Sequence, residues 1–201
     1  MTKTLNSDQA NQTTLSNLCS FTSGYPFKTE NYVKKGKYKL YTIKNVQNGF
    51  IESCVDSYLE NIPKDMDSKC LLSFMDILIS LTGNVGRSGL VYDDNCLLNQ
   101  RVLKINVQED LFSWIYILLQ NNSFINYAVK VATGTSQKNL SPSQVGDFPT
   151  IVPSEKHLKE FNDIARPAIR KIALNYKENL WLQKQRDYIL PLLLNAQVSV
   201  R

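Results

Sequence analysis

Loops rich in amide, hydroxyl and guanidinium side chains carry the clearest chemistry in this sequence. They occupy the segments 82–87, 99–101 and 133–139, and two glycines interrupt the first of them. Asn and Gln can form paired hydrogen bonds with adenine, and Arg with guanine, so such loops suit the reading of base edges in a DNA groove. The candidate contacts that we select from these loops are Thr82, Asn84, Arg87, Arg101, Thr135, Gln137 and Lys138.

Asn99 and Gln100 have a competing structural role. They end an apolar run and could instead hydrogen-bond the loop 83–86, holding its turn in shape. For this pair we favour the structural role, whereas for Arg87 and Lys138 we favour DNA. The sequence therefore predicts a polar face that contains both scaffold and contact residues.

Lysines and tyrosines are interleaved between residues 25 and 44, where six lysines are opposed by a single acidic residue, Glu30. Basic side chains with aromatic neighbours are typical of surfaces that bind the phosphate backbone. Lysines also protect exposed edge strands from pairing with other chains, and the patch alone leaves both interpretations open. The candidate DNA contacts in this patch are Tyr25, Lys28, Lys35, Lys37 and Lys44.

Other kinds of site find little support. The four cysteines lack the short paired spacings of zinc or redox motifs, so we expect them to be free, reduced and structural. His157, the only histidine, lies at a predicted helix start and is expected to be solvated. Asp67-Ser68-Lys69 with Asp56 matches a minimal metal-dependent nuclease pattern, but short patterns of this kind arise by chance. No nucleotide or S-adenosylmethionine fingerprint is present.

The charge and hydropathy patterns restrict the location of the protein. The net charge of +5 is uneven, with +1 in residues 1–150 and +4 in residues 151–201. No apolar run approaches the roughly 18 residues that a membrane span requires, and the first 14 residues are polar throughout. We therefore expect a cytoplasmic protein without a membrane segment.

The elements that position these residues can be predicted from periodicity. Residues 1–14 have the composition of a disordered tail. Strand-like runs then predict a mixed β-sheet, and the spacing of apolar residues after Gln108 predicts two helices that pack on it. The predicted strands cover residues 38–43, 50–55, 71–74, 77–81, 89–92 and 96–105, with a short extended stretch at 148–152.

A single long helix is predicted from Glu155 to about Leu190, with Ser154 as its N-cap and a kink or break at Pro167. At 1.5 Å per residue, about 36 residues span about 54 Å. Such a helix cannot bury its whole apolar stripe on a domain of about 150 residues, so part of it must meet another chain or domain. The residues that we select for that interface are Ala165, Ile169, Ile172, Tyr176 and Leu180.

Taken together, these segments resemble the specificity subunits of type I restriction-modification systems. The resemblance rests on five elements in the same order along the chain and covers nearly everything after residue 20. They are Gly24-Tyr25-Pro26-Phe27, residues 76–87, residues 97–101, the loop 133–141 and the tail 182–193.

The resemblance implies an α+β fold in which a globular target recognition domain, residues 15–153, reads one half of a split DNA site. A conserved helix, residues 154–201, would space two such domains and dock methyltransferase subunits. The chemistry would belong to partners: modification subunits methylate adenine with S-adenosylmethionine, and a restriction subunit cuts DNA with ATP and Mg²⁺. The chain itself would be non-catalytic, with no metal or cofactor of its own.

The chain departs from the family in having one recognition domain and one helix where full subunits carry two of each. It could be a natural half-subunit, a truncated product or a fragment. If it works alone, two copies are expected to pair through antiparallel helices as a homodimer on a symmetric bipartite site. Two further hypotheses are a coiled-coil adaptor that binds only protein, and a nuclease that uses Asp56, Asp67 and Lys69.

Overall fold

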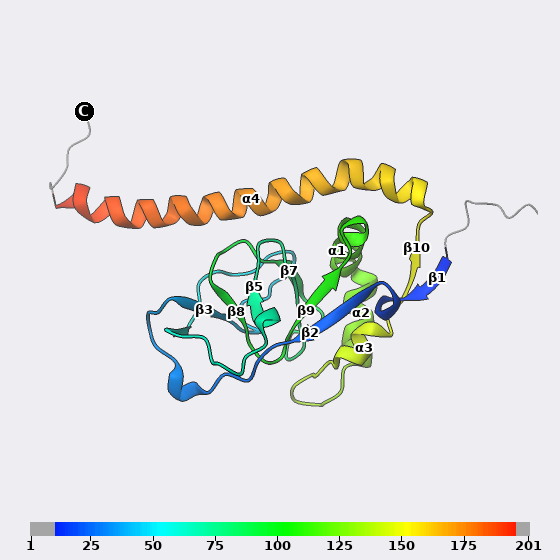
Figure 1. Cartoon of the computed structure of the whole chain (residues 1–201), viewed down its shortest axis with the longest axis horizontal. Helices are drawn as coiled ribbons and strands as arrows, with labels where there is room; N and C mark the ends of the chain where they lie inside the picture. The colour runs from blue at the N-terminus through cyan, green and yellow to red at the C-terminus, as the bar shows by residue number, and fades with distance from the viewer. Residues whose placement is uncertain (1–10, 196–201) are drawn as a thin grey trace, which may run out of the picture.

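The structure is a computed structural model that describes residues 11–195. It has the α+β fold that the sequence predicts, with a globular part of short strands and helices and a long helix, α4 (Glu155–Leu194), that lies along one side of it (Figure 1). The remaining helices are α1 (Phe112–Gln120), α2 (Asn122–Val131) and α3 (Pro142–Gly146). The strands are β1 (Asn11–Thr14), β2 (Cys19–Ser23), β3 (Tyr38–Tyr41), β4 (Tyr58–Leu59), β5 (Leu71–Leu72), β6 (Ile77–Ser80), β7 (Ser88–Leu90), β8 (Cys96–Leu98), β9 (Val102–Val107) and β10 (Pro149–Val152).

The strands form three sheets, where the sequence predicted one. An antiparallel sheet has the order β2-β9-β6-β7, and a mixed sheet has the order β4-β3-β8-β5, with β3 parallel to β8. The strands β1 and β10 pair as a separate antiparallel ribbon. Helices α1 and α2 cover the antiparallel sheet and share its core with buried residues such as Ile79, Leu103 and Ile115.

The run 96–105, predicted as one strand, is divided into β8 and β9, which belong to different sheets. The division falls at 99–101, where Arg101 has a φ of 70°. No glycine or proline marks this turn, and both strands are buried, so the apolar pattern continues across it. The polar turn 99–101 is therefore the connection between the mixed sheet and the antiparallel sheet.

The predicted disordered tail, 1–14, differs from the structure at its end. Residues 1–10 lie outside the described residues, but Asn11–Thr14 form β1 and pair with Pro149–Val152. The prediction of disorder for residues 11–14 was wrong because it rested on composition. A polar strand can be ordered by backbone hydrogen bonds to a neighbouring strand, as β1 is by β10. Short helix α3 was also not predicted, although Ser141 and Gln144 form a capping box around Pro142, which is a recognisable helix start.

Helix α4 begins after Ser154 as predicted, but it continues to Leu194 and passes Pro167 and Pro191 without a break. Figure 1 shows one continuous, gently curved helix. Among residues 11–195, no helix is long and apolar enough to cross a membrane, since α4 is rich in charged residues.

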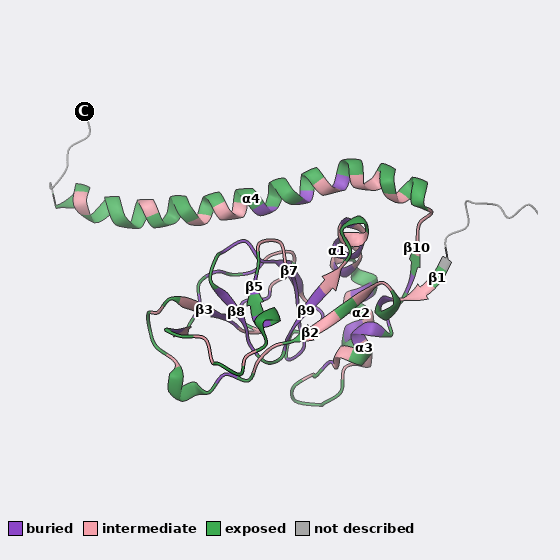
Figure 2. Ribbon diagram, viewed as in Figure 1, coloured by how far each residue is buried: buried purple, intermediate pink, exposed green. Residues whose placement is uncertain are grey.

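The apolar stripe of α4 packs on the globular part of its own chain, which changes the interpretation of the predicted interface residues. Ala165 and Ile169 are buried in the core beside α1, and Tyr176 stacks on Phe50 and Tyr92. Leu180 also packs against a second cluster of buried apolar residues, to which strands of the mixed sheet contribute. Figure 2 shows this alternation of buried and exposed positions along α4. Of the five predicted interface residues, only Ile172 is exposed.

Candidate nucleic-acid interface

The three polar segments identified in the sequence meet at one end of the antiparallel sheet. The Leu81 amide donates to the Arg101 carbonyl at 2.9 Å, and the Gly83 amide donates to the Lys138 carbonyl at 2.9 Å. The Leu140 amide returns to the Leu81 carbonyl at 2.8 Å. Loops that are up to 57 positions apart, as in the Thr82–Asn139 contact, therefore form one surface.

The loop 133–139 is closed by its own backbone. Thr133 and Asn139 exchange hydrogen bonds of 2.9 and 2.7 Å, and Gly134 has a φ of 99°. A Cβ at Gly134 would lie 2.3 Å from the Gln137 carbonyl oxygen, so this position requires glycine. The loop projects from the fold on the side away from α4 (Figure 1). Its tip exposes Thr135 and Gln137.

Two of the predicted contacts in this group are engaged in holding the loops together. Thr82 is buried, and its hydroxyl lies 3.1 Å from the Asn139 side-chain oxygen. The Lys138 Nζ donates to the Val129 carbonyl at 2.6 Å, which places its charge against the end of α2. By contrast, Asn84 and Arg101 are exposed and form no side-chain hydrogen bond within residues 11–195.

Arg87 lies apart from the other loop residues. It is half-buried, and its guanidinium donates to the Gln47 side-chain oxygen at 2.8 Å. This bond ties the start of β7 to the turn at 47–50. Asn99, for which we favoured a structural role, is buried, and its side chain accepts from the Gln100 amide at 2.7 Å. The side chain of Asn99 therefore braces its own turn, and within residues 11–195 it forms no hydrogen bond to the loop 83–86.

The basic patch lies next to this surface and is joined to it through Tyr25. The Gln100 amide donates to the Tyr25 carbonyl at 3.0 Å, and the Tyr25 hydroxyl donates to Asp65 at 2.7 Å. That hydrogen bond raises the pKa of Tyr25 and lowers the pKa of Asp65. The phenol therefore stays neutral, with its ring packed edge-on against Phe27.

The lysines of the patch divide into exposed and engaged groups. Lys28, Lys35 and Lys37 are exposed, and the Lys37 ammonium lies 5.3 Å from the centre of the Tyr38 ring. Lys44 is exposed but forms an ion pair of 2.8 Å with Asp56. Lys28 also approaches Glu30 at 4.0 Å, so among the described residues the unpaired positive charge of the patch is concentrated at Lys34, Lys35 and Lys37.

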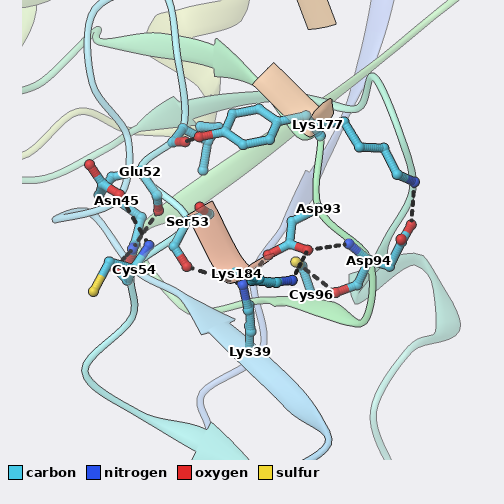
Figure 3. A network of polar contacts seen from close by, with 12 residues as sticks. Lys39, Asn45, Glu52, Ser53, Cys54, Asp93, Asp94, Cys96, Lys177 and Lys184 are labelled. Atoms are coloured by element: carbon cyan, nitrogen blue, oxygen red, sulfur yellow. Dashed lines mark hydrogen bonds and ion pairs between the residues drawn. The ribbon is translucent and has the colours of Figure 1, made fainter. Parts of the chain in front are cut away.

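Lys39 turns away from the patch and takes part in a network that joins β3 to α4 (Figure 3). Its ammonium forms an ion pair with the buried Asp93 and donates to the Ser53 carbonyl at 3.3 Å. From α4, Lys184 approaches Asp93 at 4.0 Å and Lys177 contacts Asp94 at 3.0 Å. The sequence pattern of β3 could not reveal this role of Lys39, because its acidic partner lies more than 50 positions further along the chain.

Gly24 allows the chain to cross the turn 99–101 at very short range. A Cβ at this position would lie 1.9 Å from the Asn99 carbonyl oxygen and 2.9 Å from the Gln100 nitrogen. The adjacent Tyr25 amide donates to the Leu98 carbonyl at 3.0 Å. This crossing therefore requires a glycine at the first position of the Gly24-Tyr25-Pro26-Phe27 element. The crossing in turn places the basic patch beside the polar loops.

The residues considered for other chemistry have structural partners. Asp67 accepts the Lys69 amide at 2.9 Å and caps a short 3₁₀ helix, while Asp56 pairs with Lys44. The four cysteines are free, as predicted, and burial raises the pKa of Cys96 to about 12. Within residues 11–195, no cluster of three or more His, Cys, Asp or Glu side chains could hold a metal ion.

Comparison with solved structures identifies similar folds in type I restriction-modification proteins. The S subunit from M. genitalium aligns with 83% of this chain at 19% identity and a TM-score of 0.57. The HsdS subunit from Thermoanaerobacter tengcongensis aligns with 91% of it at 12% identity and a TM-score of 0.56. A structure that describes complex assembly and conformational transition of the type I R-M system aligns with 90% of it at 11% identity and a TM-score of 0.58.

This chain corresponds to only 40%, 44% and 43% of those three chains, respectively, and at such identities the likeness concerns the fold. No curated protein matches the sequence. The family model for the type I restriction modification DNA specificity domain, in contrast, matches residues 8–183. Because this match covers most of the sequence, the chain belongs to the type I restriction-modification DNA specificity family.

Proposed function

We propose that this chain reads one half of a bipartite DNA site and docks the methyltransferase subunits of a type I restriction-modification system. The observation that carries the proposal is the convergence of three polar loops beside a basic patch, through the contacts of Arg101, Lys138 and Tyr25. Loop side chains would choose the bases, and lysines would supply affinity for phosphates.

The catalytic steps are assigned to partners. Modification subunits would bind S-adenosylmethionine and methylate adenine, and a restriction subunit would use ATP and Mg²⁺. This chain would be a non-catalytic subunit that works on DNA in the cytoplasm. Its family membership and the engaged carboxylates of Asp56 and Asp67 support that division of labour.

We assign self-association or methyltransferase docking to the exposed surface of α4. It replaces the stripe of Ala165, Ile169, Tyr176 and Leu180, which packs on the same chain. Trp181 is 58% exposed and Tyr188 is 69% exposed, which is unusual for large apolar side chains. The exposed apolar residues of α4 are Ile164, Ile172, Leu174, Trp181, Leu182, Tyr188, Ile189, Leu190, Leu193 and Leu194.

The same surface supports a second candidate function, a coiled-coil adaptor that binds protein without DNA. Retention of the purified chain on duplex DNA at increasing salt separates the two. A DNA-recognition subunit is retained at low salt and released as salt rises, because bound lysines displace counterions. Absence of retention at low salt would favour the adaptor.

The exposed lysines of the patch give a quantitative prediction. Replacing Lys28, Lys35 and Lys37 together with alanine should weaken binding to all duplexes and reduce the slope of log affinity against log salt by about 3, since each phosphate contact contributes about 0.9. The control replaces Lys156, Lys159 and Lys171, three exposed lysines of α4, and removes the same charge. Equal losses in the two variants would show a general charge effect and contradict the assigned patch.

A further inference from the structure

We propose that a hollow beside the basic patch is an additional base-reading site, in which Asn31 and Asn61 contact an adenine in the major groove of duplex DNA. The hollow has a volume of about 360 Å³ and is lined by Asn31, Leu59, Glu60, Asn61, Ile62 and Pro63. The proposal rests on the proposed function and adds to it a specific base contact outside the loops selected from the sequence.

Backbone hydrogen bonds hold the two walls of this hollow in place. On one wall, the Asn31 amide donates to the Lys28 carbonyl at 3.1 Å and closes a short 3₁₀ helix, Thr29–Asn31. Val33 and Tyr58 exchange two backbone bonds of 3.0 Å, which fixes the walls relative to each other. A further turn, from the Met66 amide to the Pro63 carbonyl at 3.1 Å, supports the second wall.

The amide groups at the rim are available to a ligand. Asn31 and Asn61 are exposed, and neither forms a side-chain hydrogen bond within residues 11–195. Several other asparagines of the globular part serve the fold: Asn45 and Asn121, for example, bond to nearby backbone atoms. The single carboxylate of the hollow, Glu60, is held by the Lys37 amide at 3.1 Å.

The charge around the hollow suits DNA. Lys28, Lys34, Lys35 and Lys37 lie on the segment that forms one wall and are all exposed. The short helix Thr29–Asn31 and the loop 133–139 both project away from α4 in Figure 1. A duplex that crosses this side would meet phosphate contacts and the hollow together.

The chemistry of the lining favours an A·T pair. An asparagine amide can donate to adenine N7 and accept from adenine N6, and apolar groups contact the thymine methyl. The hollow supplies both features, because Ile62 and Pro63 lie beside the two amides. Guanine would present O6 and N7 acceptors, which match arginine better, and the hollow contains no arginine.

The test selects duplexes from a random library with the full chain and with the Asn31→Ala, Asn61→Ala double variant. Neither residue has a positive φ, so alanine fits the backbone, and thermal unfolding checks that the variant folds. We expect the double variant to enrich the same motif with one A·T position relaxed. A discrimination of about 10-fold or more at that position should fall to near unity. Affinity for the preferred duplex should fall by about the same factor, while affinity for duplexes that lack this A·T pair stays unchanged. An Asn175→Ala variant on α4 is the matched control.

The outcomes separate this inference from the proposed function. An unchanged motif in the double variant overturns the base-reading hollow and leaves the proposed function standing. A wild-type chain that enriches no motif overturns both. Loss of affinity for all sequences without relaxation of any position also contradicts base reading, because the two asparagines would then act only on the backbone.

Discussion

Replacing Gly24 with alanine is expected to destabilise the protein by about 3 kcal/mol, the upper range for overpacking of a close contact. The added Cβ would lie 1.9 Å from the Asn99 carbonyl oxygen, and neither backbone can withdraw without losing a hydrogen bond. The Gly24 amide donates to the Val102 carbonyl at 3.1 Å, and Tyr25 bonds to Leu98 and Gln100 on both sides of the crossing. Urea denaturation of both proteins measures the difference.

Gly83→Ala is the matched control for this substitution. Gly83 has a φ of 73°, but a Cβ would meet no atom within 4 Å. The left-handed conformation alone costs about 1–2 kcal/mol for an alanine, so this variant should lose less stability than Gly24→Ala. Equal losses would mean that the crossing at Asn99 is not as tight as the structure indicates.

The second large effect concerns α4. Ile169→Asp should lower the free energy of unfolding by about 4 kcal/mol, because it removes a buried apolar side chain and places a carboxylate in the core. Ile169 is 4% exposed and packs with α1, beside Ala165 and Ala173. The sequence alone placed Ile169 at an interface with another chain or domain, where a charged residue would weaken assembly and leave the globular part folded. Thermal unfolding with analytical ultracentrifugation distinguishes the two.

Ile172→Asp provides the comparison, since Ile172 is 49% exposed on the same helix. Its effect on unfolding should stay within about 0.5 kcal/mol, while self-association or methyltransferase docking weakens. A strong loss of stability in Ile172→Asp, or none in Ile169→Asp, would contradict the packing of α4 described above.

Local patterns predicted much of the fold. The spacing of Leu111, Ile115 and Leu119 identified α1, and Ser154 marked the start of α4. The fold class follows from such elements. Local patterns could not show which element packs against each apolar face. The stripe of α4 was recognised from sequence, but only the three-dimensional packing shows that it is covered by α1 and by Phe50 and Tyr92.

The same limit applies to the candidate site. Residue type marked the polar loops that the structure brings together, but it did not distinguish Asn84, which is exposed, from Thr82, which is buried against Asn139. Lys39 and Lys37 look alike in the sequence, yet one is paired with Asp93 and the other faces solvent. Burial and long-range pairing decide such roles, and both depend on contacts between distant segments.

The most direct test of the central claim is a methylation map. The chain is co-expressed with its cognate modification subunits, and methylated adenines are located in the host DNA. Residues 15–153 are then exchanged for those of another member of the specificity family, with α4 unchanged. If the globular part determines which DNA sequence is recognised, methylation continues after the exchange but all the methylated sites change. Methylation at the original sites after the exchange would contradict the claim.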